Sequence, residues 1–146
     1  MPEQKTRERA EEDKREGKAP STQAGEFVRE EVEHVRKGKH GARSTKQAIA
    51  IGLSKARRAG VKLPAKKGTS KKTKTQAARD IQEGMSASKG KKSARRSRAT
   101  SSALKREGRS AASKKALSRQ ARSAAAKRSA ASRSRSAKKA ARTRKK

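Results

Sequence analysis

The chain has 146 residues, a formal net charge of +32 at pH 7 and no cysteine. Only 14 residues are large and apolar (Leu, Ile, Val, Met or Phe), too few to offset roughly 1–2 kcal/mol of backbone entropy per residue along the whole chain. The composition therefore excludes a large hydrophobic core, and the lack of cysteine excludes disulfides and thiolate metal sites.

No apolar run approaches the roughly 18–20 residues that a membrane span needs. The first residues, MPEQKTRERAEEDKREGK, lack the apolar stretch of a secretory signal, so we expect a soluble, cytoplasmic protein with no membrane contact. Residues 1–37 hold ten acidic and nine basic residues, whereas residues 38–146 hold three acidic and 36 basic residues. The cationic block predicts a polyanionic partner, and DNA and RNA are the abundant polyanions of a cell.

Residues 1–21 form a charged N-terminal segment that we expect to be disordered or transiently helical. Glu3 and Arg7, and Glu11 and Arg15, stand at i,i+4, a spacing that supports a solvated helix. Pro20 is expected to close this segment.

Residues 22–37 have the pattern of an amphipathic helix. At 100° per residue, its apolar side chains fall within about 140° of arc; they are Ala24, Phe27, Val28, Val32 and Val35. Glutamates lie early in the segment and basic residues late, as the helix dipole favours. Gly38 is expected to end the helix.

A second helix is expected to begin after Ser44, because Ser44 and Gln47 match the capping box S-x-x-Q. Its apolar stripe is again about 140° wide and consists of Ala48, Ile49, Gly52, Leu53, Ala56 and Ala59. Gly60 is a ready residue for the left-handed turn that ends a helix, and Pro64 ends the unit. The two stripes predict a small antiparallel helical hairpin over residues 22–64.

We expect less order in the rest of the chain. Residues 65–85 are interpreted as a basic linker with a short helix near 75–85, and residues 86–146, the tail, as a low-complexity segment of Ala, Ser, Lys and Arg. Charge repulsion is expected to keep the tail disordered until phosphates neutralise it. The predicted fold class is therefore mainly α with large disordered regions: one helical hairpin and a basic tail.

The residues do not favour an enzyme, a cofactor or a small-molecule substrate. Glu30 and Glu31 stand near His34 at helical spacing, which we interpret as a surface pair rather than a metal site. The glutamates of the same helix are read as a solvated face, with an acidic surface that competes for the tail as the alternative. Asp80 and Glu83 are also expected to be solvated.

The predicted nucleic-acid-binding residues begin in the loop before Ser44, where free backbone N–H groups and nearby cations predict a phosphate seat; an ordinary capped turn is the alternative. They continue through the linker and the tail. They are Lys39, Arg43, Ser44, Lys46, Arg57, Arg58, Lys66, Lys67, Lys71, Lys72, Lys91, Lys92, Arg95, Arg96, Arg98, Lys105, Arg106, Arg109, Lys114, Lys115, Arg119, Arg122, Lys127, Arg128, Arg133, Arg135, Lys138, Lys139, Arg142 and Arg144.

This pattern predicts contacts to phosphates rather than to bases. Phe27 is the only aromatic residue of the chain, so no aromatic platform is present for stacking bases. We expect sequence-nonspecific binding and compaction of double-stranded DNA by a nucleoid-associated protein, with a homodimer through the hairpin compatible with the pattern. Two alternatives stay open: an RNA- or ribosome-associated protein, and an antitoxin-like protein-interaction module whose tail only localises it.

The segment GEFVREEVEHVRKGKHGARSTKQAIAIGLSKARRAGVKLP, residues 25–64, resembles a bacterial domain of unknown function found in small basic proteins. Those proteins are often labelled plasmid-stabilisation or DNA-binding proteins, and they carry a tail similar to ALKREGRSAASKKALSRQARSAAAKRSAA. The tail also resembles those of linker histones and bacterial histone-like proteins. The resemblance implies a DNA-binding role but no mechanism.

Overall fold

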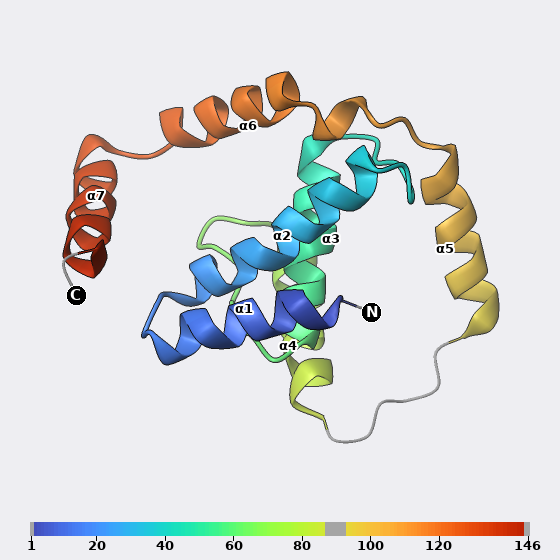
Figure 1. Ribbon diagram of the computed structural model, residues 1–146, viewed down its shortest axis with the longest axis horizontal. Helices are drawn as coiled ribbons and strands as arrows, with labels where there is room; N and C mark the ends of the chain where they lie inside the picture. The colour runs from blue at the N-terminus through green and yellow to red at the C-terminus, as the bar shows by residue number, and fades with distance from the viewer. Residues whose placement is uncertain (1, 87–92, 145–146) are drawn as a thin grey trace.

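The computed structural model describes residues 2–86 and 93–144 (Figure 1). These residues form seven α-helices and one short 3₁₀ helix. In chain order the elements are α1 (Gln4–Arg15), α2 (Pro20–Arg36), α3 (Thr45–Arg58), α4 (Lys71–Met85), α5 (Ala94–Arg106), η1 (Ser110–Ala112), α6 (Lys114–Ala126) and α7 (Ala130–Arg144).

Helices α1 to α4 pack together and form what we call the body. In Figure 1, α1 and α2 lie side by side in opposite directions, α3 crosses α2, and α4 lies against α3. The predicted hairpin of α2 and α3 is therefore only the centre of a larger helical unit. The fold class given by the sequence, a small hairpin with large disordered regions, is wrong, because α1 and α4 complete the packing.

The sequence signals for α2 and α3 are largely confirmed. Gly38 follows α2 with φ +73° and Gly60 follows α3 with φ +99°, the left-handed turn that glycine adopts without strain. The Ser44 side chain accepts a hydrogen bond from the backbone N–H of Gln47. Pro20, however, is the first residue of α2 rather than the end of the preceding segment, because proline needs no N–H partner at that position.

Two small apolar clusters make up the core. Both contain more alanine than large side chains, so neighbouring helices approach closely. One consists of Val32, Val35, Ala42, Ala48, Ala111 and Ala112, with Leu117 packed on it. The other consists of Ala10, Ala24, Phe27, Ala56 and Val61, with Leu53 and Leu63 packed on it.

Helix α4 starts four residues before the helix that the sequence predicted, and a buried acid holds it to α3. Asp80 is 1% exposed and accepts hydrogen bonds from Ser54 Oγ at 2.8 Å and Arg58 Nε at 2.9 Å. The expectation of a solvated Asp80 is therefore wrong, and the helix expected near 75–85 extends back into the segment read as linker. The partners of Asp80 are 22 and 26 residues away in the sequence, beyond the reach of a local pattern.

The described part of the tail, residues 93–144, is largely helical, which corrects the prediction of a disordered, low-complexity segment. Each of its three α-helices is preceded by a serine whose side chain accepts a hydrogen bond from the backbone N–H three residues further on; these serines are Ser93, Ser113 and Ser129. Such caps satisfy free N–H groups, and Ala, Lys and Arg all favour helix. In Figure 1, α5, α6 and α7 follow one another around the outside of the body.

The close approach of α2 and α3 gives a testable prediction. A β-carbon added to Gly52 would lie 2.7 Å from Cα of Val28, whereas one added to Gly25 would meet nothing within 4 Å. We expect Gly52→Ala to lower the free energy of unfolding by about 1–3 kcal/mol, the range of overpacked cores. The control, Gly25→Ala, should raise it by about 0.4–1 kcal/mol.

Urea unfolding followed by circular dichroism measures both variants. Equal stability of Gly52→Ala and the parent protein would contradict the close helix contact.

Candidate nucleic-acid interface

Helices α5, α6 and α7, which we call the cationic helices, contain no acidic residue. None of their residues is buried in the described chain. Their lysines and arginines take part in no salt bridge between described residues. They are Arg95, Arg96, Arg98, Lys105 and Arg106 on α5, Lys114, Lys115, Arg119 and Arg122 on α6, and Arg133, Arg135, Lys138, Lys139, Arg142 and Arg144 on α7.

The cations are arranged differently on the three helices. At 100° per residue, those of α6 span about 140° of arc, which leaves the side of Leu117 to face the body. Leu117 does pack on the core there. The cations of α5 cover about half of its circumference, about 180° of arc, and those of α7 are spread around the whole circumference. Positive charge is thus exposed on all three helices.

A segment that sequence reasoning missed, residues 104–112, joins the cationic helices to the body; we call it the docking segment. Gly41 N–H donates to the carbonyl of Leu104 at 2.8 Å, and Ala42 N–H donates to that of Gly108 at 3.0 Å. The η1 helix carries the buried Ala111 and Ala112, and two alanines in an alanine-rich tail gave no distinct signal of docking.

Two body side chains also hold η1. The buried Thr45 hydroxyl donates to the carbonyl of Ala111 at 2.7 Å, and Arg36 Nε donates to that of Ala112 at 2.8 Å. Because these bonds satisfy backbone carbonyls, the docking segment has a defined position on the body.

The predicted phosphate seat before α3 is engaged within the protein. Lys39 Nζ is 2.9 Å from a Glu3 carboxylate oxygen, and Arg43 is 3.7 Å from that of Glu107. The backbone N–H of Arg43 donates to the Gln47 side chain, and Ser44 caps α3. The loop is thus a capped turn, and phosphate binding by its exposed cations, Lys46 among them, stays a prediction.

The other predicted residues fall into three groups. Arg57 and Arg58 hold the body together, since Arg57 Nε donates to the Leu63 carbonyl and Arg58 binds Asp80. Arg109 and Arg128 lie between the tail helices, and Lys127 ends α6. Exposed lysines before and in the first turn of α4 are Lys66, Lys67, Lys71 and Lys72, and Lys91 and Lys92 lie outside the described residues.

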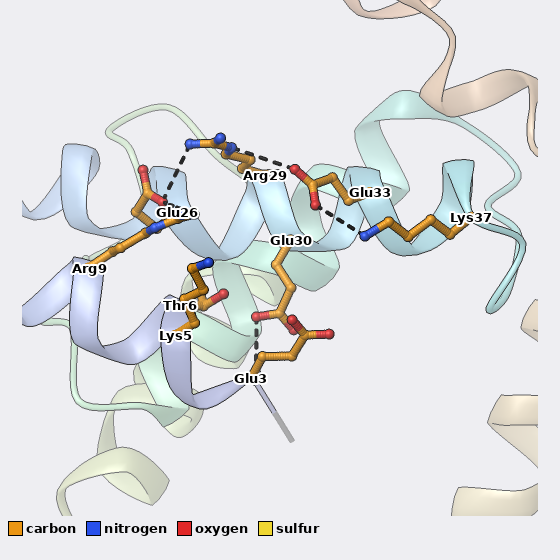
Figure 2. A pocket seen from close by; sticks show the side chains of 9 residues that line it. All are labelled: Glu3, Lys5, Thr6, Arg9, Glu26, Arg29, Glu30, Glu33 and Lys37. Atoms are coloured by element: carbon orange, nitrogen blue, oxygen red, sulfur yellow. Dashed lines mark hydrogen bonds and ion pairs between the residues drawn. The ribbon is translucent and has the colours of Figure 1, made fainter.

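The glutamates of α2 do not form the solvated face that the sequence suggested. Glu30 is 6% exposed and Glu31 is fully buried. Glu26 and Glu33 line a cavity of about 240 Å³ between α1 and α2, where they pair with basic residues of the body. Figure 2 shows these pairs, which join Glu26 to Arg9 and Arg29, and Glu33 to Arg29 and Lys37.

Glu3 closes one end of this acidic region. Its carboxylate lies 3.0 Å from Nε2 of His34 and 2.9 Å from Lys39 Nζ. Hydrogen bonds from His34 and Lys39 lower the pKa of the Glu3 carboxyl from 4.5 to about 2. Among the described residues, the acids of α2 pair with basic residues of the body and with none of the cationic helices.

Comparison with known proteins identifies one similarity. Residues 14–67 match a family of unknown function, DUF6496, and this match covers α2, α3 and the turns around them. Neither a curated protein nor a solved structure matches the chain. Within residues 2–86 and 93–144, no helix has the length and apolar character required to cross a membrane.

The docking segment can be tested with a pair of glycine variants. A β-carbon on Gly41 would lie 1.8 Å from the carbonyl oxygen of Glu107, whereas one on Gly108 would meet nothing within 4 Å. We expect Gly41→Ala to detach the docking segment, because the chain there cannot yield without losing its hydrogen bonds. Trypsin should then cleave after Arg106 and Arg109 several-fold faster than in the parent protein.

Gly108→Ala is the matched control and should leave the cleavage rate unchanged. Identical cleavage of both variants would show that residues 104–112 are not held by Gly41.

Proposed function

We propose that the protein binds double-stranded DNA through phosphate contacts, without reading its sequence. The observation that supports this most directly is the set of cations on α5, α6 and α7, which have no acidic partner among the described residues. Such a surface attracts a polyanion through the release of condensed counterions. The cations are distributed over three helices rather than gathered in one pocket. This distribution fits a long polymer with regularly repeated phosphates.

The side chains available for contact favour the DNA backbone over the bases. Lysine and arginine neutralise phosphates, whereas base stacking needs aromatic side chains. Phe27 is 1% exposed and belongs to the core, so its ring is not accessible to a ligand. Arginines on opposite sides of α7 would let one helix contact phosphates of neighbouring DNA segments, and such bridging supports compaction.

Binding of this kind would place the protein on the nucleoid or on plasmid DNA, where it would act in compaction or plasmid maintenance. RNA carries the same phosphates, and we treat it as the competing ligand in the test. The antitoxin-like alternative would use the body instead, and it predicts that the cationic helices are dispensable for the main interaction.

The experiment compares two triple variants that remove the same charge. Arg135, Lys138 and Arg142 lie on one face of α7 and are exposed, and Lys5, Lys14 and Arg15 are exposed on the charge-balanced α1. Changing each set to glutamine removes three positive charges in either place. Affinity for two unrelated duplexes is measured by fluorescence anisotropy over a range of salt concentrations.

We expect the parent protein to show a log–log slope of affinity against salt near −9, if about ten cations meet phosphates. The α7 variant should flatten this slope by up to about 2.7, since each phosphate contact contributes about 0.9. The α1 variant should keep the parent slope. Equal slopes for both variants, a hundredfold difference between the duplexes, or a strong preference for structured RNA would each contradict the proposal.

A further inference from the structure

Four ionisable side chains meet inside the body, next to the α2–α3 contact. Glu31 is fully buried, and one of its carboxylate oxygens, Oε2, accepts a hydrogen bond from Lys55 Nζ at 2.6 Å. The other oxygen, Oε1, lies 3.2 Å from Nε2 of His40 but has no well-aligned hydrogen bond in the described structure. Beside it, His34 and His40 pack edge to face, with ring centroids 6.2 Å apart.

The chain brings these groups together through two local features. Glu31 and His34 stand at i,i+3 on α2, so they share one face of that helix. His40 follows the left-handed turn at Gly38 and folds back toward the same face. One ligand atom from each of Glu31, His34 and His40 lies within 4.8 Å of the other two.

The carboxylates around this cluster outnumber the lysines that contact them. Glu30 and Glu31 have side chains 4% and 0% exposed, and Lys55 is the cation that contacts both, at 3.9 Å and 2.6 Å. Glu3 is matched by Lys39. One buried negative charge is left over, and a buried charge without a partner is costly.

A carboxylate and two imidazoles are the ligand set of many zinc sites. We propose that Glu31, His34 and His40 bind a Zn²⁺ ion, with water as the fourth ligand. This ion would offset the remaining negative charge, and Oε1 of Glu31, which has no aligned hydrogen bond, would coordinate it. Its site is independent of the DNA-binding surface, because none of its ligands belongs to α5, α6 or α7.

The distances are close to those that zinc requires. Zn–N and Zn–O bonds of 2.0–2.2 Å set ligand atoms about 3.4 Å apart in a tetrahedron. Glu31 and His40 already meet this spacing at 3.2 Å, and the widest separation in the set, 4.8 Å at most, must shorten by about 1–1.5 Å to reach it. His34 would bind the ion through Nδ1, because its Nε2 lies 3.0 Å from a carboxylate oxygen of Glu3; a carboxylate on the other ring nitrogen is the support that metal-binding histidines typically have.

The full-length protein is titrated with Zn²⁺ in the presence of a competing chromogenic chelator, and Co²⁺ absorption in the visible region reports the coordination geometry. We expect one tightly bound ion per chain and the intense absorption of four-coordinate Co²⁺. Affinity should fall by at least about a hundredfold in His40→Ala, since losing a ligand exceeds the 10–100-fold effect of losing a supporting group.

A matched pair of variants identifies the carboxylate. Glu31→Gln should abolish the Co²⁺ spectrum, and Glu33→Gln, two residues away and half-exposed, should leave it unchanged. Circular dichroism confirms that each variant is folded, and His40→Ala, in the loop, covers the case in which Glu31→Gln unfolds.

Absence of a stoichiometric ion would overturn the proposal. So would equal losses in Glu31→Gln and Glu33→Gln, which would indicate diffuse binding to surface carboxylates, or full affinity in a folded His40→Ala variant.

Discussion

The structure depends on close approach between helix backbones, because the chain has too few large apolar side chains to hold helices apart. Gly52 meets the backbone of Val28, and Gly84 meets that of Arg57, so α3 touches both of its neighbours at glycines. Alanines fill the remaining space in both apolar clusters. The core is held by short-range dispersion contacts between many small groups. It is thin, so a small increase in side-chain volume disturbs its packing.

Ion pairs with a buried carboxylate supplement this thin core. Lys55 binds Glu31 across α2 and α3, and Arg58 binds Asp80 across α3 and α4. Such pairs contribute little net stability relative to apolar packing, but removing the cation leaves a buried carboxylate without its partner, which is costly. These pairs therefore serve mainly to determine which helix faces pack together. Alanine-rich faces resemble one another and do not specify one arrangement by themselves.

The sequence predicted those parts of the structure that have local causes. The stripes and caps of α2 and α3 were visible because periodicity and glycine positions act within a few residues. The burial of Asp80 and Glu31 was not, since their partners Arg58 and Lys55 are more than twenty residues away. The cations of the tail could be identified from composition, but the docking of Ala111 could not, because alanine in an alanine-rich tail carries no distinguishing signal.

The docking segment has a consequence for how the cationic helices act together. It fixes the C-terminal end of α5 and the N-terminal end of α6 to one place on the body. Once one of these helices holds a polyanion, the other is confined near it, and its second contact becomes intramolecular. Its effective concentration then reaches the millimolar range typical of short connections. In the proposed DNA binding, two individually weak helices would thereby gain the avidity of a bivalent ligand, without a second copy of the chain.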